Sequence, residues 1–435
     1  MNSETFVLPA SYKKWTFGLI IAGVVALLYG VIFLHPFTAP AHHAVGEAAG
    51  HGAEHAANAA DSYAATRFWS VLLQNSIYWL LVVNASMFFI CVTTMAMGGW
   101  QVAFRRVPEA ISSVVPILGG ICLLVLIAIV FGHRTDIYHW LDRDAVAKDK
   151  ILAGKSGFLS PIVFIVMSVI AIGSWYFLGK KMRSLSLESD AAGAMDYDTS
   201  KKWIWKNTVW GAAFLVAFGL TVGSTIPWLW IMSLDAHWYS TMFSWYTFAS
   251  TFVAGMALIA LFVIFLKNRD QLEYVNDEHL HDIGKFMFAF SIFWTYLWFS
   301  QYMLIWYSNQ TEETRYFVAR IGTESKDSNY HLLFFLNLIL SFLAPLLILM
   351  TKGAKRNWNL LGFMAIVIIF GHWIDFYQMI MPSTMKEHGE MNLFEFGVPC
   401  LFVGLIMWGT GRYLSAHPLT PKNHPFMKES IIHHT

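Results

Sequence analysis

Two copies of one short motif carry the ionisable residues of this chain whose spacing suggests chemistry. The pattern F-G-H-x-x-D-x-Y occurs at 131–138 and again at 370–377. On a helix, a histidine and an aspartate three residues apart share one face, so the carboxylate can fix the tautomer of the imidazole and favour its protonated form. We therefore expect two proton-handling pairs. They are His133 with Asp136 and His372 with Asp375, with Tyr377 beside the second pair.

Each motif copy lies at the end of an apolar segment of membrane length. An ionisable residue in such a segment is costly and by default indicates function. The alternative is that both pairs are helix-end residues among lipid headgroups and water.

The composition is that of a polytopic membrane protein. Of 435 residues, 56% are hydrophobic and 13% charged, about half the charge usual in a soluble protein. The net charge of +1 gives no indication of a nucleic-acid partner. The three cysteines form no C-x-x-C or C-x-x-C-H motif. We therefore expect no metal site, iron–sulfur cluster or haem c ligated by this chain.

Apolar runs long enough to cross a hydrocarbon core predict an all-α fold with about ten transmembrane helices. The first run exceeds the roughly 7–15 apolar residues of a signal peptide, so we interpret it as a retained anchor. The runs lie at 15–35, 69–97, 110–132, 157–179, 207–231, 239–266, 285–308, 329–351, 358–381 and 395–415.

Lysine and arginine collect in alternate loops, which predicts that both termini are cytoplasmic. By the same rule both motif copies lie at the outer face and point the same way. Equal orientation argues against the inverted repeats common in secondary transporters. The basic loops carry Lys13 and Lys14, Arg105 and Arg106, Lys180 to Arg183, Lys201 and Lys202, Lys267 and Arg269, and Lys352 to Arg356.

We expect one transmembrane domain, 1–435, with four parts. They are a periplasmic His/Ala-rich loop at 36–68, a first helix bundle at 69–231, a second at 239–381, and the last helix with a cytoplasmic tail at 395–435. The first loop contains His42, His43 and Glu47; a flexible or partner-contacting segment is favoured there over a metal site. The segment 188–198 is expected to connect the fourth and fifth helices.

Further residues are candidates for a proton path. A small, hydroxyl-bearing face on the sixth helix is compatible with close helix packing or with a water-filled path. Acids and histidines precede the seventh helix, where they could gather protons or simply stabilise the helix N-terminus. The candidates are Ser244, Thr247 and Thr251 on the sixth helix, Gln301 and Tyr302 on the seventh, Asp235 and His237 in an outer loop, and His281 and Asp282 at the inner face.

Two runs resemble a known family. They are W-T-Y-L-W-F-S-Q-Y-M-L-I-W-Y-S-N at 294–309, followed by Glu312-Glu313-Thr314, and G-H-W-I-D-F-Y-Q-M-I-M-P at 371–382. The chain resembles the NrfD-like membrane subunits of bacterial alternative complex III, the second of its two such subunits most closely. The resemblance covers the whole chain in helix number and order.

The resemblance implies a subunit of a quinol:cytochrome c or quinol:oxidase oxidoreductase in the bacterial inner membrane. It implies two four-helix bundles with flanking helices, helices two to five and six to nine. It also implies menaquinone or ubiquinone as the quinone, with haem c and iron–sulfur clusters held by other subunits. Those partners would be a multihaem cytochrome c, an iron–sulfur subunit, a second NrfD-like subunit, a mono-haem cytochrome c and a terminal oxidase, besides membrane lipid.

NrfD-like subunits that oxidise quinol place a histidine and an aspartate near the outer face, and the residues of matching type here are those of the two motif copies. Quinol oxidation needs a base for each hydroxyl and a nearby electron acceptor, and this chain offers only the bases. Three alternatives stay open: a purely architectural membrane anchor, a cytochrome whose two outer histidines ligate a b-type haem, and a secondary transporter.

Overall fold

The chain is an all-α polytopic membrane protein, as its sequence predicts. The computed structural model describes residues 6–38, 52–323 and 325–434, and within 52–61 it describes the helical backbone but not the side chains. In these ranges nine helices are long and apolar enough to cross a membrane. The only strands found there form a two-residue hairpin, β1 (Gly322–Thr323) with β2 (Lys326–Asp327).

The long helices account for all ten predicted apolar runs. Nine meet the length and hydropathy criteria for spanning; the aromatic-rich run 285–308 forms the tenth, α10, which packs along α9. The long helices are α1 (Ala10–Phe33), α2 (Gly52–Met95), α4 (Val115–Phe131), α7 (Pro161–Ala191), α8 (Tyr197–Leu220), α9 (Phe243–Lys267), α10 (Asp277–Ser308), α12 (His331–Leu338) continued by α13 (Ala344–Ile348), α15 (Trp358–Thr384) and α16 (Leu393–Ala416). The short ones are α3 (Arg106–Ser112), α5 (Arg143–Lys148), α6 (Lys150–Lys155), α11 (Thr311–Ile321), α14 (Lys352–Arg356) and α17 (Met427–Ile431).

Local sequence explains where the helices that build the site begin. Asn357 caps α15, since its side chain accepts the backbone N–H groups of Asn359 and Leu360. Asn276 caps α10 in the same way, and His279 completes a capping box. These caps satisfy N–H groups that have no partner inside the helix.

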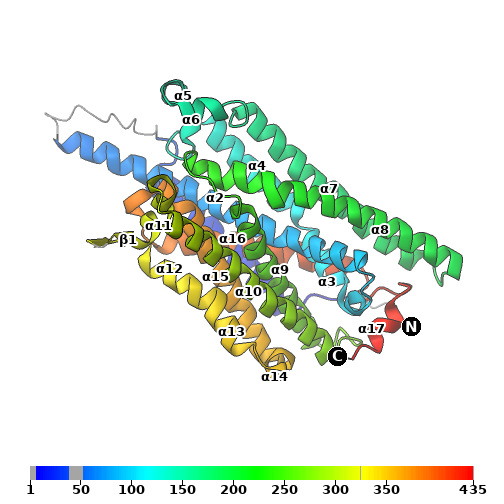
Figure 1. Cartoon of the computed structure of the whole chain (residues 1–435). Coiled ribbons are helices and arrows are strands. Elements are labelled where there is room, and N and C mark those ends of the chain that lie inside the picture. Colours follow the sequence, from blue (N-terminus) through cyan, green and yellow to red (C-terminus); the bar gives the residue numbers. More distant parts are fainter. Residues whose placement is uncertain (1–5, 39–51, 324, 435) are drawn as a thin grey trace.

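The helices pack in two groups joined through α2. In one group α2, α4, α7 and α8 contact one another; in the other, α9, α10, α15 and the α12–α13 segment do so. Helix α2 also contacts α9 and α15, so it lies between the groups (Figure 1). The core therefore forms around α2, α9 and α15, whose side chains are the most completely buried.

Helices α1 and α16 form a closely packed antiparallel pair at the edge. Glycines set the distance: a Cβ added at Gly23 would lie 2.4 Å from the Cβ of Leu401, and one at Gly404 would lie 2.7 Å from Ile20. Such small residues let two helix backbones approach closely in a membrane. Most of the remaining surface of α1 is exposed to the surroundings.

The two ends of the bundle differ in their loops. One end carries Lys13, Arg106, Lys181, Lys267 and Lys352, together with α3, α14 and α17, and we call it the basic end. Lys13 places the start of α1 there. The end of α16 lies beside it, because Tyr12 donates a hydrogen bond to the carbonyl of Met407 and a Cβ at Gly411 would meet Tyr12. The opposite end carries α5, α6, α11 and the β hairpin (Figure 1).

Two predictions about the loops were inaccurate. The segment 36–68 was expected to be irregular, but α2 begins at Gly52, because the alanine-rich stretch 52–60 favours a helix. The histidine-rich part around His42 and His43 lies outside the described residues. The expected connector 188–198 is shorter than predicted, since α7 runs to Ala191 and α8 begins at Tyr197.

Candidate functional site

His372 and Asp375 lie deep inside the bundle, halfway along α15. His372 follows Trp358 by 14 residues and precedes Thr384 by 12, about 21 and 18 Å of helix. Both side chains have an exposed fraction of zero. They share one face of α15 as predicted, and they lie within the helix rather than at its end. The helix continues through Pro382 to Thr384, so the motif lies well before its end.

Asp375 accepts hydrogen bonds from three other helix segments. Its Oδ1 accepts from the hydroxyl of Tyr246 on α9 and from Nδ2 of Asn337 on α12, the latter at 2.8 Å. Its Oδ2 accepts from the indole N–H of Trp294 on α10 at 2.9 Å. All three donors are at least 96% buried. These bonds offset the cost of placing a carboxylate in an apolar medium, which is several kcal/mol for an unpaired ion.

The imidazole of His372 is only partly satisfied. Its Nδ1 lies 3.0 Å from the hydroxyl of Ser250 and 3.9 Å from Oδ2 of Asp375, the second distance too long for a hydrogen bond. Trp294 contacts the ring edge-on at a centroid distance of 5.2 Å. Among the described residues, Nε2 is buried with no hydrogen-bond partner. An unpaired ring nitrogen is free to accept or release a proton.

Small residues allow α15 and the α12–α13 segment to pack closely around Asp375. Ser341, one turn after Asn337, donates to the amide oxygen of Asn337 at 2.9 Å and so orients its N–H₂ toward Asp375. A Cβ at Gly371 would lie 2.7 Å from the hydroxyl of Ser341. The glycine of the F-G-H motif therefore permits close contact between α15 and the α12–α13 segment.

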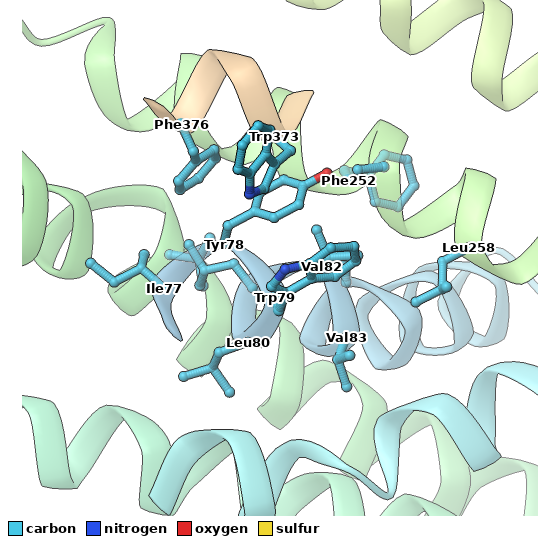
Figure 2. Packing of buried hydrophobic residues seen from close by; sticks show 14 of the residues in the cluster. Ile77, Tyr78, Trp79, Leu80, Val82, Val83, Phe252, Leu258, Trp373 and Phe376 are labelled. Carbon is cyan, nitrogen blue, oxygen red and sulfur yellow. The ribbon is translucent and has the colours of Figure 1, made fainter. Parts of the chain in front are cut away.

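Aromatic side chains separate the pair from the first helix group. Figure 2 shows Tyr78 and Trp79 of α2 facing Trp373 and Phe376 of α15. Tyr78 donates to the carbonyl of Ile369 at 2.7 Å and packs on Phe376 at 5.1 Å between centroids. This wall fixes the rotation of α15 and directs the histidine and aspartate away from α2.

A buried arginine lies one turn from Asp375, toward the opposite end. Pro382 lacks an N–H, so the carbonyl of Gln378 has no partner within α15. The Nε of Arg320 on α11 donates to that carbonyl at 2.8 Å. The guanidinium also lies 3.3 Å from the ring centroid of Tyr316, and Arg320 is 2% exposed. The carbonyl that Pro382 leaves free thus holds the guanidinium of Arg320 about one turn of α15 beyond Asp375.

Polar residues continue from this arginine to the surface of the opposite end. Tyr316 stacks on Trp238 at 4.1 Å. Its neighbour Arg315 pairs with Asp235, with Nε 3.0 Å from Oδ2. The second helix group therefore contains polar side chains at several heights between Asp375 and the surface of the opposite end, which we call the polar levels. They are Tyr246, Arg320, Tyr316 and the Arg315–Asp235 pair.

The half of α15 toward the basic end is apolar. Every residue from Leu360 to Gly371 is apolar or glycine. Leu361, Met364, Ala365 and Ile368 on its buried face have no exposed surface. Along α15 from Leu360 onward, the polar residues therefore begin at His372 and continue toward the opposite end.

The first motif copy does not form the predicted pair. Helix α4 ends at Phe131, and His133 has φ +48°, so His133 and Asp136 lie in a turn and share no helical face. Asp136 instead accepts from Arg134 at 2.7 Å and from Thr66 at 2.5 Å, while His133 is exposed. The glycine and polar residues after Phe131 end the helix, whereas the second copy is followed by apolar residues that continue it.

The hydroxyl stripe of α9 serves packing in this structure. Thr247 and Thr251 donate to carbonyls one turn earlier, and Ser244 to the carbonyl of Ser224 at 3.3 Å. Gly255 at the end of the stripe faces α2, since a Cβ there would lie 2.8 Å from Ala85. The face of α9 that meets the pair is the one carrying Tyr246 and Ser250.

The remaining sequence candidates are distributed over both ends. At the opposite end His237 pairs with Asp149, and this hydrogen bond holds the pKa of Asp149 below its ordinary value. At the basic end Asp282 pairs with Lys285 at 2.5 Å and with His433 at 2.7 Å. His281 lies 4.0 Å from Glu278. The structure does not bring these residues to the pair.

Three candidates lie closer to the polar levels. Gln301 accepts from Ser240 at 3.3 Å. Tyr302 stacks on Trp298 at 6.2 Å between centroids. Tyr377 is buried two residues after Asp375 and lies 6.2 Å from the ring of Tyr330.

The partners of the pair were missed by sequence reasoning. Tyr246 with Ser250, and Asn337 with Ser341, each place two polar residues four apart in an apolar run, which puts both on one face. That spacing was the available signal. Arg320 had no such signal, because α11 is a surface helix by composition and its burial depends on Pro382 of another helix.

Comparison with known proteins assigns no family. No family model matches this chain, and no curated protein sequence does either. Across the described ranges, no group of three or more histidine, cysteine or acidic side chains is arranged to hold a metal ion.

Proposed function

We propose that this chain is the proton-handling membrane subunit of a quinol-oxidising respiratory complex in the bacterial inner membrane, with His372 and Asp375 as its proton site. One observation supports this most: a completely buried histidine–aspartate pair inside a helix long and apolar enough to span a membrane, bonded to three other helix segments and keeping one imidazole nitrogen without a partner among the described residues. Ionisable residues at such positions are expensive to bury and typically mark proton relays.

The geometry supports proton storage with exchange toward the opposite end. Asp375 already accepts three neutral donors, whereas Nε2 of His372 has no partner among the described residues, so a proton arriving at the site is best placed on that nitrogen. Tyr246 donates to the carboxylate, and its ring contacts Phe243, which in turn contacts Tyr316 beside Arg320. The apolar half of α15 opposes proton passage to the basic end.

A quinone headgroup does not fit beside the pair in this conformation. Both side chains have no exposed surface, and their faces are occupied by Ser250, Trp294 and Asn337. His372 and Asp375 are therefore proposed to handle protons without contacting the quinone. In the proposed complex quinol would be oxidised at another subunit, with haem c and iron–sulfur clusters carried by the partner subunits, and the released protons would exchange with this site.

The strongest alternative is an architectural role. The observation that favours it is that Asp375 accepts hydrogen bonds from α9, α10 and α12, and these bonds alone would hold the three helices against α15. Replacement of Asp375 by Asn separates the two functions. An architectural role predicts assembly and turnover close to wild type; a proton role predicts intact assembly with slowed turnover or lost proton release.

A further inference from the structure

A groove between α1 and α16 at the basic end combines an apolar lining with two cations. It has a volume of about 680 Å³. Phe6, Val7, Leu8, Phe17 and Trp408 supply its apolar lining. Lys13 and Arg412 supply the charge, and Ser415 the polar floor.

The polar groups of this groove have no counter-ion within the protein that the structure describes. Lys13 and Arg412 are exposed and form no ion pair with another described residue. The hydroxyl of Ser415 is buried and has no hydrogen-bond partner there. Arg412 is oriented by Trp408, with its Cζ 5.6 Å from the ring centroid. Two cations and one hydroxyl that have no partner among the described residues together favour an anionic ligand with several acceptor oxygens.

The position of the groove favours a ligand that has an apolar part beside its anionic group. It runs from Trp408 to Ala416, about 12 Å along α16, and the exposed Trp15 lies near it on α1. Tryptophan is enriched where a membrane meets water. The lining thus offers apolar surface on the membrane side and basic surface at the level of the headgroups.

We infer that this groove is a binding site for one anionic phospholipid, with the phosphate between Lys13 and Arg412 and the acyl chains along Phe17 and Trp408. Basic pockets between transmembrane helices on the cytoplasmic side are suited to such headgroups. The pairing of α1 with α16 by glycines gives the groove rigid walls. The bound lipid would in turn help to hold the edge helix α1 against α16.

Native mass spectrometry of the full-length chain in neutral detergent tests this, with phosphatidylglycerol and phosphatidylcholine as probes. Wild type should retain one phosphatidylglycerol in preference to phosphatidylcholine. Each basic residue near a membrane surface is worth about fivefold in affinity, so the double variant Lys13→Gln/Arg412→Gln should bind phosphatidylglycerol roughly 25-fold more weakly. Lys14→Gln removes the same charge one residue away, outside the groove, and should match wild type.

A second variant tests the groove without changing its charge. Ala416→Trp fills the lining at an exposed position and should displace the lipid while Lys13 and Arg412 remain. Equal retention of both phospholipids, or unchanged binding in the double variant and in Ala416→Trp, would overturn the inference. Displacement of phosphatidylglycerol by soluble glycerol phosphate would assign the site to a free phosphate ester instead.

Discussion

Replacement of Asp375 by Asn or by Leu should separate the proton role of the pair from its structural role. Leucine would leave three buried donors without an acceptor, those of Tyr246, Trp294 and Asn337. Each unsatisfied donor costs about 1–3 kcal/mol, so Asp375→Leu should lower the free energy of unfolding by about 3–9 kcal/mol. This variant should assemble poorly.

Asparagine can keep nearly all of these contacts. Its amide oxygen can accept from Trp294, and its N–H₂ can donate to the hydroxyl oxygen of Tyr246. The amide of Asn337 can then turn over, because the hydroxyl of Ser341 can accept as well as donate. Asp375→Asn should therefore cost only about 1–2 kcal/mol of stability and should assemble normally.

The same asparagine variant removes the charge that the proton role requires. A positioned proton-transfer group contributes about 10²–10⁴-fold to its step, so we expect quinol-driven turnover of the assembled complex in proteoliposomes to fall by at least 10²-fold wherever that step limits the rate. Proton release, followed with a pH-sensitive dye, should fall with it. Asp136→Asn is the matched control, because Asp136 lies in the other motif copy and pairs with Arg134. Wild-type turnover and proton release in Asp375→Asn would refute the reasoning.

Three further predictions concern Tyr246, the contact between α1 and α16, and the C-terminal segment. Tyr246→Phe removes one donor to Asp375 and should lower stability by about 1–2 kcal/mol, measured by thermal unfolding, and should also slow turnover; an unchanged turnover would exclude Tyr246 from the proton path. Gly23→Leu should destabilise the chain by about 1–3 kcal/mol because a Cβ there meets α16 at 2.4 Å, whereas Gly18→Leu, with no atom within 4 Å of such a Cβ, should not; equal melting temperatures would contradict the α1–α16 contact. Burial, and after it the charges of Arg105 and Arg106, hold the pKa of His424 well below its ordinary 6.5. Below about pH 6.5 the histidine therefore binds a proton only when the C-terminal segment, residues 417–434, has detached from the bundle. Lowering the pH through this value should thus weaken the attachment of the segment. Protease cleavage of this segment should rise over that range in wild type and much less in His424→Gln; cleavage independent of pH in wild type would contradict the assignment.

The fold was predictable because membrane helices depend on local sequence. An apolar run of sufficient length predicts a spanning helix without knowledge of its neighbours. The run 285–308 shows the limit of a hydropathy criterion, since its tryptophans and tyrosines lower the mean hydropathy although the helix is 32 residues long.

The site was predictable only in part. Spacing was sufficient to place His372 and Asp375 on one face, because both lie inside a continuous helix. The same spacing failed for His133 and Asp136, because the helix ends before them. The position of the second pair along its helix depends on where α15 ends. The sequence near Pro382 does not specify that end, because the helix continues through the proline to Thr384.

The partners of the pair depend on tertiary contacts. Asn337 approaches Asp375 because Gly371 allows the α12–α13 segment to come close. Arg320 is buried because Pro382 frees a carbonyl on a different helix. Neither relation can be read from periodicity within one segment, so both required the packed structure.

The most direct test of the proton site is infrared difference spectroscopy of the intact complex, comparing its oxidised and quinol-reduced states. Because His372 and Asp375 share a buried site, a change in its protonation should perturb the carboxyl and imidazole bands together. We predict signals that disappear in Asp375→Asn and persist in Asp136→Asn. Difference spectra that are identical in wild type and Asp375→Asn would contradict the assignment of His372 and Asp375 as the proton site.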